Sequence, residues 1–139
     1  MSYTSQYSVI EELESNNSRL FKEDVIKREA EEENIDFFEG CKLALDPMVS
    51  FGVKQVPERS GPDGRGLPWG EFCDLTDQLM KRELTGHAAR DAIIEAMDTS
   101  HDSEWNKWYR RILIKDLRCG VSEKTINNVV KKVNKDFTI

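Results

Sequence analysis

Cysteine is scarce in this sequence, and its spacing excludes two classes of small protein. The three cysteines, Cys41, Cys73 and Cys119, lie far apart and form no paired motif. An odd and scattered set predicts neither a disulfide framework nor a zinc site, so we expect no metal ligands in this chain. Because cysteine often behaves as a small apolar residue, we expect all three side chains to be buried.

Long hydrophobic runs are also absent. No apolar stretch approaches the roughly 18 residues that a membrane-spanning helix requires. The N-terminus carries Glu11, Glu12 and Glu14 where a signal peptide would need basic residues followed by an apolar run. These absences predict a cytoplasmic chain without membrane contact, and its 139 residues suffice for one domain with its own core.

Strand-like alternation is almost absent, and helical spacing of apolar residues dominates. Residues 47–67 hold three of the four prolines and four of the eight glycines, and Ser60–Gly66 (SGPDGRG) is typical of a flexible surface loop. The pattern predicts an all-α fold, a single compact bundle of about seven helices with one Pro/Gly-rich loop. The expected helices cover about residues 5–15, 18–33, 35–46, 103–118 and 122–134, with two more that begin near residues 68 and 85.

Positive and negative residues are unevenly distributed along the chain, whose net charge is −6. Residues 1–104 hold 11 Lys and Arg against 23 Asp and Glu, whereas residues 105–139 hold nine against three. This asymmetry favours an anionic partner at the C-terminal end. Uneven scattering of charges on solvated faces explains it equally well, so charge alone does not decide.

Basic residues recur at helical spacing in the expected helix 103–118. Lys107, Arg111, Lys115 and Arg118 are spaced i, i+4, i+8 and i+11, which places them within about 80° on an ideal helix. Like charges on one strip repel each other, so a counter-charge is expected. Carboxylates from the acidic half or phosphates from outside would supply it, unless the strip is simply a solvated face.

Two expected helix starts combine a glycine, a hydroxyl and main-chain N–H groups that lack partners. They lie in Leu84–Ala89 and in Cys119–Thr125, and such a start suits a phosphate. Each is an ordinary helix cap when taken alone. The polar side of the last helix adds Lys124, Asn128 and Lys131, residue types that suit phosphates and groove edges, although an ordinary solvated face would look the same.

Catalytic residues are hard to find. His87 and His101 have no evident nucleophile as a partner, and no phosphate-binding loop or dinucleotide fingerprint occurs. Pro62-Asp63-Gly64-Arg65 invites comparison with a nucleotidyltransferase motif, but Gly61 stands where the nucleophilic lysine would have to be. We therefore expect no catalytic residue in these 139 residues.

A series of short motifs runs through the C-terminal half. It consists of Leu84-Thr85-Gly86, Ala88-Ala89, Arg110-Arg111, Lys115-Asp116-Leu117, Cys119-Gly120 and Ser122. In this order and spacing, the series resembles the N-terminal domain of ATP-dependent DNA ligases of the T-even bacteriophage type. The likeness is best over residues 84–133, weaker over 43–82 and generic over the first 40 residues.

The resemblance implies a helical DNA-binding domain over residues 1–139, which acts in DNA replication, repair and recombination. Such a domain lies across the minor groove of nicked duplex DNA without sequence preference. Its partners would be nicked duplex DNA and the catalytic domains of the same ligase, and we expect a monomer. The nucleotidyltransferase and OB domains, absent from this chain, would use ATP and Mg²⁺. No cofactor is expected in this domain, and a phage protein would act in the cytoplasm of its bacterial host.

The motifs and the basic faces together predict a set of DNA-binding residues. They are Thr85, Gly86, His87, Lys107, Arg111, Lys115, Arg118, Gly120, Ser122, Lys124, Thr125, Asn128 and Lys131. An alternative from another class is a protein-interaction module, in which the acidic N-terminal half docks on a basic partner. An independent enzyme is disfavoured because nucleophile and metal sets are missing.

Overall fold

Helices make up all the regular secondary structure of the computed structural model, which describes residues 5–133 and 135–139. The elements are α1 (Gln6–Glu14), α2 (Arg19–Glu31), α3 (Ile35–Leu45), α4 (Trp69–Met80), α5 (Gly86–Thr99), α6 (Asp102–Glu104), the π-helical η1 (Trp105–Tyr109), α7 (Arg110–Leu113) and α8 (Glu123–Lys132). Because α6, η1 and α7 follow one another directly, they form one continuous rod, called the central rod below. The predicted all-α bundle of about seven helices is confirmed.

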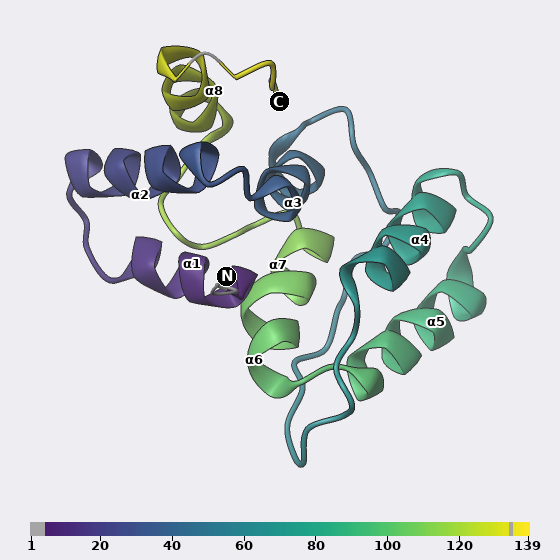
Figure 1. Ribbon diagram of the computed structural model, residues 1–139. Helices are drawn as coiled ribbons and strands as arrows, with labels where there is room; N and C mark the ends of the chain where they lie inside the picture. The colour runs from purple at the N-terminus through teal and green to yellow at the C-terminus, as the bar shows by residue number, and fades with distance from the viewer. Residues whose placement is uncertain (1–4, 134) are drawn as a thin grey trace.

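The central rod lies between two groups of helices (Figure 1). α1 and α3 pack against the rod, α2 packs on α1, and α8 packs on both α2 and α3. α4 and α5 pack against each other on the other side of the rod (Figure 1). No helix in the described ranges is both long enough and apolar enough to span a membrane.

Aromatic side chains fill the space around the central rod. Trp105 and Trp108 are buried, and the Tyr109 ring stacks on Phe72 with 4.3 Å between centroids. Phe37 of α3 stacks on Trp108 at 6.0 Å. Aromatic pairs at these separations add about 0.5–1.5 kcal/mol each beyond the burial of their area. The rod is therefore the element through which α3 and α4 share one core.

Polar caps explain where several helices begin. Ser18 accepts a hydrogen bond from the main-chain N–H of Phe21, and Ser122 accepts one from Thr125. Such caps satisfy donors that the first helical turn leaves without partners. The observed bounds of α1, α2, α3 and α8 agree with the predicted ones to within two residues, and α4 and α5 begin within one residue of the predicted starts. Ser122 is confirmed as a cap. Thr85 occupies the predicted cap position of α5, but its side chain accepts no capping hydrogen bond.

The predicted helix 103–118 is wrong at its C-terminal end, because the rod stops at Leu113. Lys115 and Arg118 adopt left-handed backbone conformations, with φ of 58° and 54°. The Asp116 carboxylate accepts a hydrogen bond from the Arg118 N–H at 3.0 Å and so stabilises a turn. Lys107, Arg111, Lys115 and Arg118 therefore do not form one helical strip.

The Pro/Gly-rich loop is tied to the junction of α5 and α6. The main-chain N–H groups of Gly64 and Gly66 donate to the carbonyls of Ser100 (3.0 Å) and Thr99 (2.8 Å). The mostly buried guanidinium of Arg59 pairs with Asp102 and donates to the carbonyl of Met97 at 2.9 Å. The surface position predicted for this loop is confirmed, but the sequence pattern did not reveal these tethers.

The cysteines are free thiols, of which Cys41 and Cys119 are buried as predicted. The prediction is wrong for Cys73, which is partly exposed because it lies at the edge of the buried face of α4. Desolvation is the main reason why the pKa of Cys73 is raised to about 11, and the nearby carboxylate of Glu39 raises it further. A thiol with such a pKa is a weak nucleophile near neutral pH.

Substituting Gly40 with alanine tests the packing of α3 on the central rod. A methyl group at Gly40 would overlap the Trp108 ring and approach Ile112 Cδ1 to 3.1 Å. We expect Gly40→Ala to lower the free energy of unfolding by about 1–3 kcal/mol through overpacking. Urea unfolding followed by tryptophan fluorescence measures this change.

Gly70→Ala is the matched control, because Gly70 is also helical but no heavy atom lies within 4 Å of the methyl position. Because Gly70 is the second residue of α4, this second substitution should not lower the free energy of unfolding. Equal effects of the two substitutions would contradict the close packing of Gly40 against Trp108.

Candidate nucleic-acid interface

The segment that joins the central rod to α8, residues 114–122, is called the connecting loop. Together with the first turn of α8 it surrounds a shallow hollow of about 330 Å³. Five of the predicted DNA-binding residues line this hollow, namely Lys115, Arg118, Gly120, Ser122 and Thr125. The structure thus brings together the part of the predicted site that surrounds the Cys119-Gly120 turn.

α8 adds an exposed polar face next to this hollow. Ile126, Val129 and Val130 are buried against α2 and α3, whereas Lys124, Asn128 and Lys131 face solvent. Within the described part of the chain, the ammonium groups of Lys124 and Lys131 take part in no ion pair. We call Arg118, Ser122, Lys124, Asn128 and Lys131 the basic edge.

The start of α8 contributes main-chain donors to the basic edge. The first intrahelical hydrogen bond runs from the Ile126 N–H to the Ser122 carbonyl at 3.2 Å, and Ser122 Oγ accepts from the Thr125 N–H. The N–H groups of Glu123 and Lys124 precede these bonds, so the helix itself supplies them with no acceptor. A helix start of this kind carries a partial positive charge.

Lys107 and Arg111 pair with carboxylates of α1. Lys107 Nζ lies 3.4 Å from a carboxylate oxygen of Glu11, and Arg111 pairs with Glu14. Arg111 also donates to the carbonyl of Leu117 at 3.1 Å, and only 13% of its side chain is exposed. For these two cations, the counter-charge comes from the acidic half of the same chain.

Lys115 is also engaged within the protein. Its ammonium group donates to the carbonyls of Leu43 (3.0 Å), Asp46 (2.7 Å) and Val49 (2.6 Å). It also lies 5.8 Å from the centroid of the Phe51 ring. Desolvation lowers the pKa of Lys115, and the charge of Asp46 partly opposes that shift. The side chain therefore turns inward, toward the end of α3.

The predicted residues at the start of α5 lie far from the basic edge. Thr85, Gly86 and His87 are exposed, and Figure 1 shows α5 and α8 on opposite sides of the molecule. α5 packs on α4, whereas α8 packs on α2 and α3. The structure therefore does not join the two predicted helix starts into one site.

Lys22 belongs to this region although the sequence pattern did not single it out. Its side chain projects from α2, is only 8% exposed, and donates to the Cys119 carbonyl at 2.6 Å. Helical spacing could have predicted this position, because Lys22 precedes the buried Ile26 by four residues and so lies on the inner side of α2.

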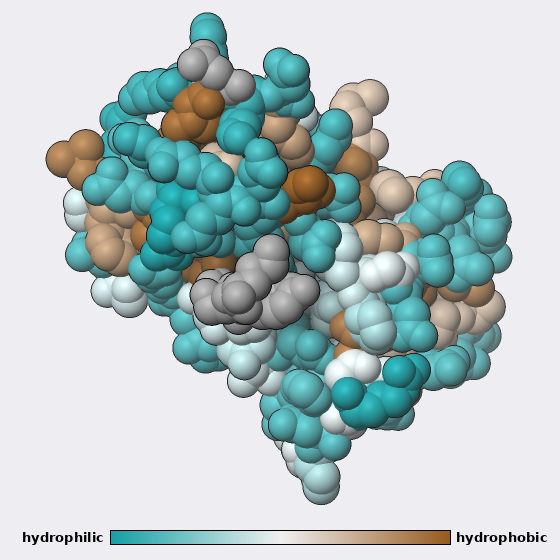
Figure 2. Space-filling model, viewed as in Figure 1, coloured by the Kyte–Doolittle hydropathy of each residue, from teal (hydrophilic) through white to brown (hydrophobic). Residues whose placement is uncertain are grey.

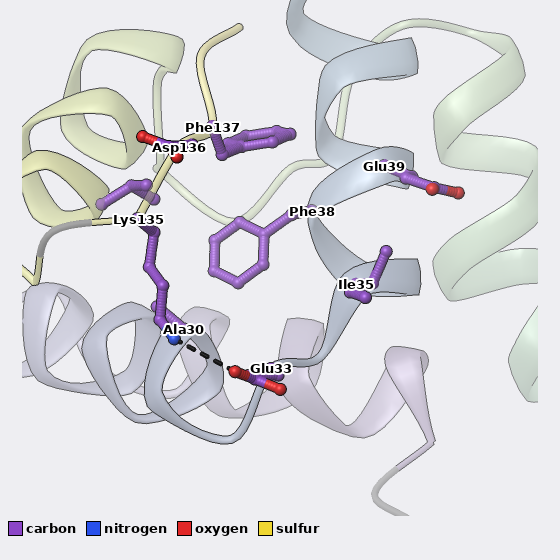
Figure 3. Close-up of a pocket in the computed structure, with 9 residues that line it drawn as sticks. Ala30, Glu33, Ile35, Phe38, Glu39, Lys135, Asp136 and Phe137 are labelled. Carbon is purple, nitrogen blue, oxygen red and sulfur yellow. Dashed lines mark hydrogen bonds and ion pairs between the residues drawn. The ribbon is translucent and has the colours of Figure 1, made fainter.

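A second, more apolar hollow of about 410 Å³ lies between α2, α3, α8 and residues 135–137 (Figure 3). The rings of Phe38 and Phe137 meet there in a T-shaped arrangement with 5.5 Å between centroids, and Lys135 pairs with Glu33 at 3.3 Å. Glu33, Glu39 and Asp136 also line this hollow. Three carboxylates against one paired lysine make it a poor match for a polyanion.

Hydrophilic residues dominate the face of the molecule drawn in Figure 2, and hydrophobic ones form separate patches. Large exposed apolar side chains include Leu20, Ile35 and Met48, which come from different segments. Scattered exposed apolar residues are normal on a soluble surface. The basic edge is therefore the feature whose chemistry best defines a ligand.

Comparison with known proteins relates this chain to a domain of DNA ligases. No family model matches it. DNA ligase 4 of Arabidopsis thaliana is 30% identical over 76 residues, which cover 55% of this chain and 6% of that protein. The solved structure named "Pmar-Lig_Pre." is 52% identical with a TM-score of 0.92. The match covers 94% of this chain and 30% of the chain in that structure. The structure named "Pmar-Lig_PreS3" is 51% identical with a TM-score of 0.94. That match covers 99% of this chain and 32% of the chain in the structure.

These matches confirm the predicted kinship with DNA ligases at a general level. The chain spans about a third of the two solved structures and a small part of DNA ligase 4. The T-even bacteriophage type stays a prediction, as do the DNA-binding roles of the individual residues.

Glu12 illustrates how the acidic half is used inside the fold. Its carboxylate accepts hydrogen bonds from Arg28 at 2.6 and 3.0 Å, which join α1 to α2. The hydrogen bond from Arg28 is the main reason why the pKa of Glu12 is lowered, and desolvation partly opposes this shift. The ionised carboxylate therefore stabilises the fold above its unfolded pKa, and this contribution is lost as the pH falls through the lowered pKa.

Substituting Glu12 with glutamine tests this linkage. At pH 7 we expect Glu12→Gln to lower the free energy of unfolding by about 0.5–1 kcal/mol, the range for partly exposed pairs. The difference from the wild type should shrink as the pH falls below the usual value of 4.5 and through the lowered pKa. Urea unfolding at a series of pH values measures it. Glu95→Gln, at an exposed carboxylate on α5, is the control, and an equal pH-dependent loss there would contradict the assignment.

Proposed function

We propose that this chain is the DNA-binding domain of an ATP-dependent DNA ligase of the T-even bacteriophage type, and that it binds nicked duplex DNA. The observation that carries the proposal is the similarity to ligase-named structures over 94% and 99% of the chain. The basic edge supports it, because it offers exposed cations in a chain whose net charge is −6.

The basic edge suits contacts with the sugar-phosphate backbone. Arg118, Lys124 and Lys131 supply positive charge, while Ser122 and the start of α8 supply directed donors. Such groups position a protein on a duplex without reading its bases. Binding therefore depends on backbone charge and minor-groove shape, and sequence preference is weak.

In a ligase, this domain would hold the nick for the catalytic domains of the same protein. Those domains would use ATP and Mg²⁺, whereas the chain described here contributes grip and orientation. Holding reactive groups in place lowers a barrier by removing motional freedom before the chemical step. DNA replication, repair and recombination all produce nicks on which such a domain would act.

Removing charge from the basic edge tests the proposal. Fluorescence anisotropy with a labelled nicked duplex should show affinity that falls steeply as salt concentration rises, because bound counterions are released. Each of Arg118→Gln, Lys124→Gln and Lys131→Gln should reduce the log–log salt slope by about 0.9 if the side chain contacts one phosphate. Duplexes of different sequence should lose affinity alike.

Arg65→Gln is the matched control. Arg65 is an exposed cation on the Ser60–Gly66 loop (69% of its side chain is exposed), and by the colour bar this loop forms the tip opposite α8 in Figure 1. The same charge is removed, but the affinity and the slope should stay at wild-type values. Wild-type protein that binds neither nicked nor intact duplex at low salt would contradict the proposal. Capture of a basic protein by the acidic half would then favour the protein-interaction module.

A further inference from the structure

The connecting loop needs external support to keep its shape. Lys115 and Arg118 have φ of 58° and 54°, and Gly120 has φ of 70°. Left-handed conformations are unfavourable for residues with a side chain. Lys115 and Arg118, three positions apart, therefore keep this conformation only when the surrounding structure holds them, whereas glycine at position 120 adopts it freely. The groups that hold this loop therefore decide how the basic edge is presented.

Lys22 holds the C-terminal part of the connecting loop. Its ammonium group donates to the Cys119 carbonyl at 2.6 Å from a largely buried position on α2. A methyl group at Gly120 would lie 2.6 Å from the same nitrogen. The glycine thus serves two purposes, since it allows the left-handed turn and leaves room for the Lys22 ammonium group beneath the loop.

Lys115 fixes the N-terminal part of the loop to α3. An ammonium group has three N–H donors, and those of Lys115 meet three carbonyls at 3.0, 2.7 and 2.6 Å. No donor remains for a phosphate unless one of these bonds is broken. Breaking one would remove a charge-assisted hydrogen bond, which is among the stronger kinds.

We propose that Lys22 and Lys115 are positioning residues, which hold the connecting loop in the shape that presents Arg118, Ser122 and the start of α8 to the DNA backbone. This inference rests on the proposed function. It changes the role of Lys115, which the sequence pattern predicted to contact DNA itself. It adds Lys22, which lies outside the motifs that carry the resemblance.

The salt dependence of binding separates positioning from contact. For Lys22→Met and Lys115→Met we expect an affinity for nicked duplex about tenfold lower at every salt concentration, the factor that corresponds to one lost charge-assisted hydrogen bond. Arg118→Gln itself should reduce the log–log slope by about 0.9. On the Arg118→Gln background, adding either methionine substitution should leave the slope unchanged, because neither lysine itself contacts a phosphate.

Amide NMR spectra add a readout that does not depend on DNA. Lys22→Met and Lys115→Met should shift the main-chain signals of residues 114–122 and leave those of α4 and α5 in place. Arg118→Gln should shift only its immediate neighbours. If the wild type binds no DNA, the proposed function fails, and these spectra alone then decide whether Lys22 and Lys115 hold the loop.

Lysine acetylation of the wild-type chain keeps the inference testable if a variant does not fold. With acetic anhydride and mass spectrometry, Lys22 and Lys115 should react slowly with and without nicked duplex. Lys124 should react fast alone and slowly with DNA. A Lys115 that reacts fast alone and is protected by DNA would overturn the inference. A further decrease in salt slope on the Arg118→Gln background would also overturn it, as would unchanged affinity or unshifted loop signals in the methionine variants.

Discussion

Cationic side chains that end on main-chain carbonyl groups hold the non-helical parts of this molecule in place. Lys115 donates to three carbonyls around the end of α3. Arg110 donates to the carbonyl of Val56, and Arg59 donates to the carbonyl of Met97. Carbonyls in coil segments and in the last turn of a helix lack the partners that a helix interior provides, and a buried one without a donor costs about 1–3 kcal/mol. A charged donor on a long side chain satisfies such groups across large sequence separations. Coil and helices can therefore share one core.

This use of cations changes what the basic residues can do for a partner. Lys22 and Lys115 bind carbonyls, while Lys107 and Arg111 bind carboxylates of α1. Counting charges along residues 105–139 therefore overstates the positive charge that reaches solvent. The exposed positive charge of this segment is concentrated on α8 and on the turn before it. The same internal pairs engage the carboxylates of α1, so part of the acidic half is also unavailable to an external partner.

The sequence predicted the helices well because their information is local. The spacing of Ile126, Val129 and Val130, with Ser122 before them, was enough to predict α8, its cap and its exposed side. The end of the central rod could not be predicted in this way. Apolar spacing continues through Leu117, so the pattern extended the helix beyond Leu113. The structure instead ends the helix where Lys115 can reach carbonyls 66–72 residues earlier in the chain.

The same limit applies to the candidate site. Helical periodicity was enough to predict that Lys124 is exposed. The inward direction of Lys115 could not be predicted, because it depends on contacts between distant parts of the chain that periodicity does not contain.

A chain with net charge −6 can bind a polyanion only if its charges act locally. At physiological ionic strength, interactions between exposed charges fade beyond about 8–10 Å. Exposed carboxylates on α4 and α5 lie across the molecule from α8 (Figure 1) and therefore contribute little at the basic edge. The carboxylates of Glu11 and Glu14 are nearer in the fold, but Lys107 and Arg111 partly neutralise them. The fold thus pairs some cations with carboxylates of the acidic half and leaves others exposed on α8.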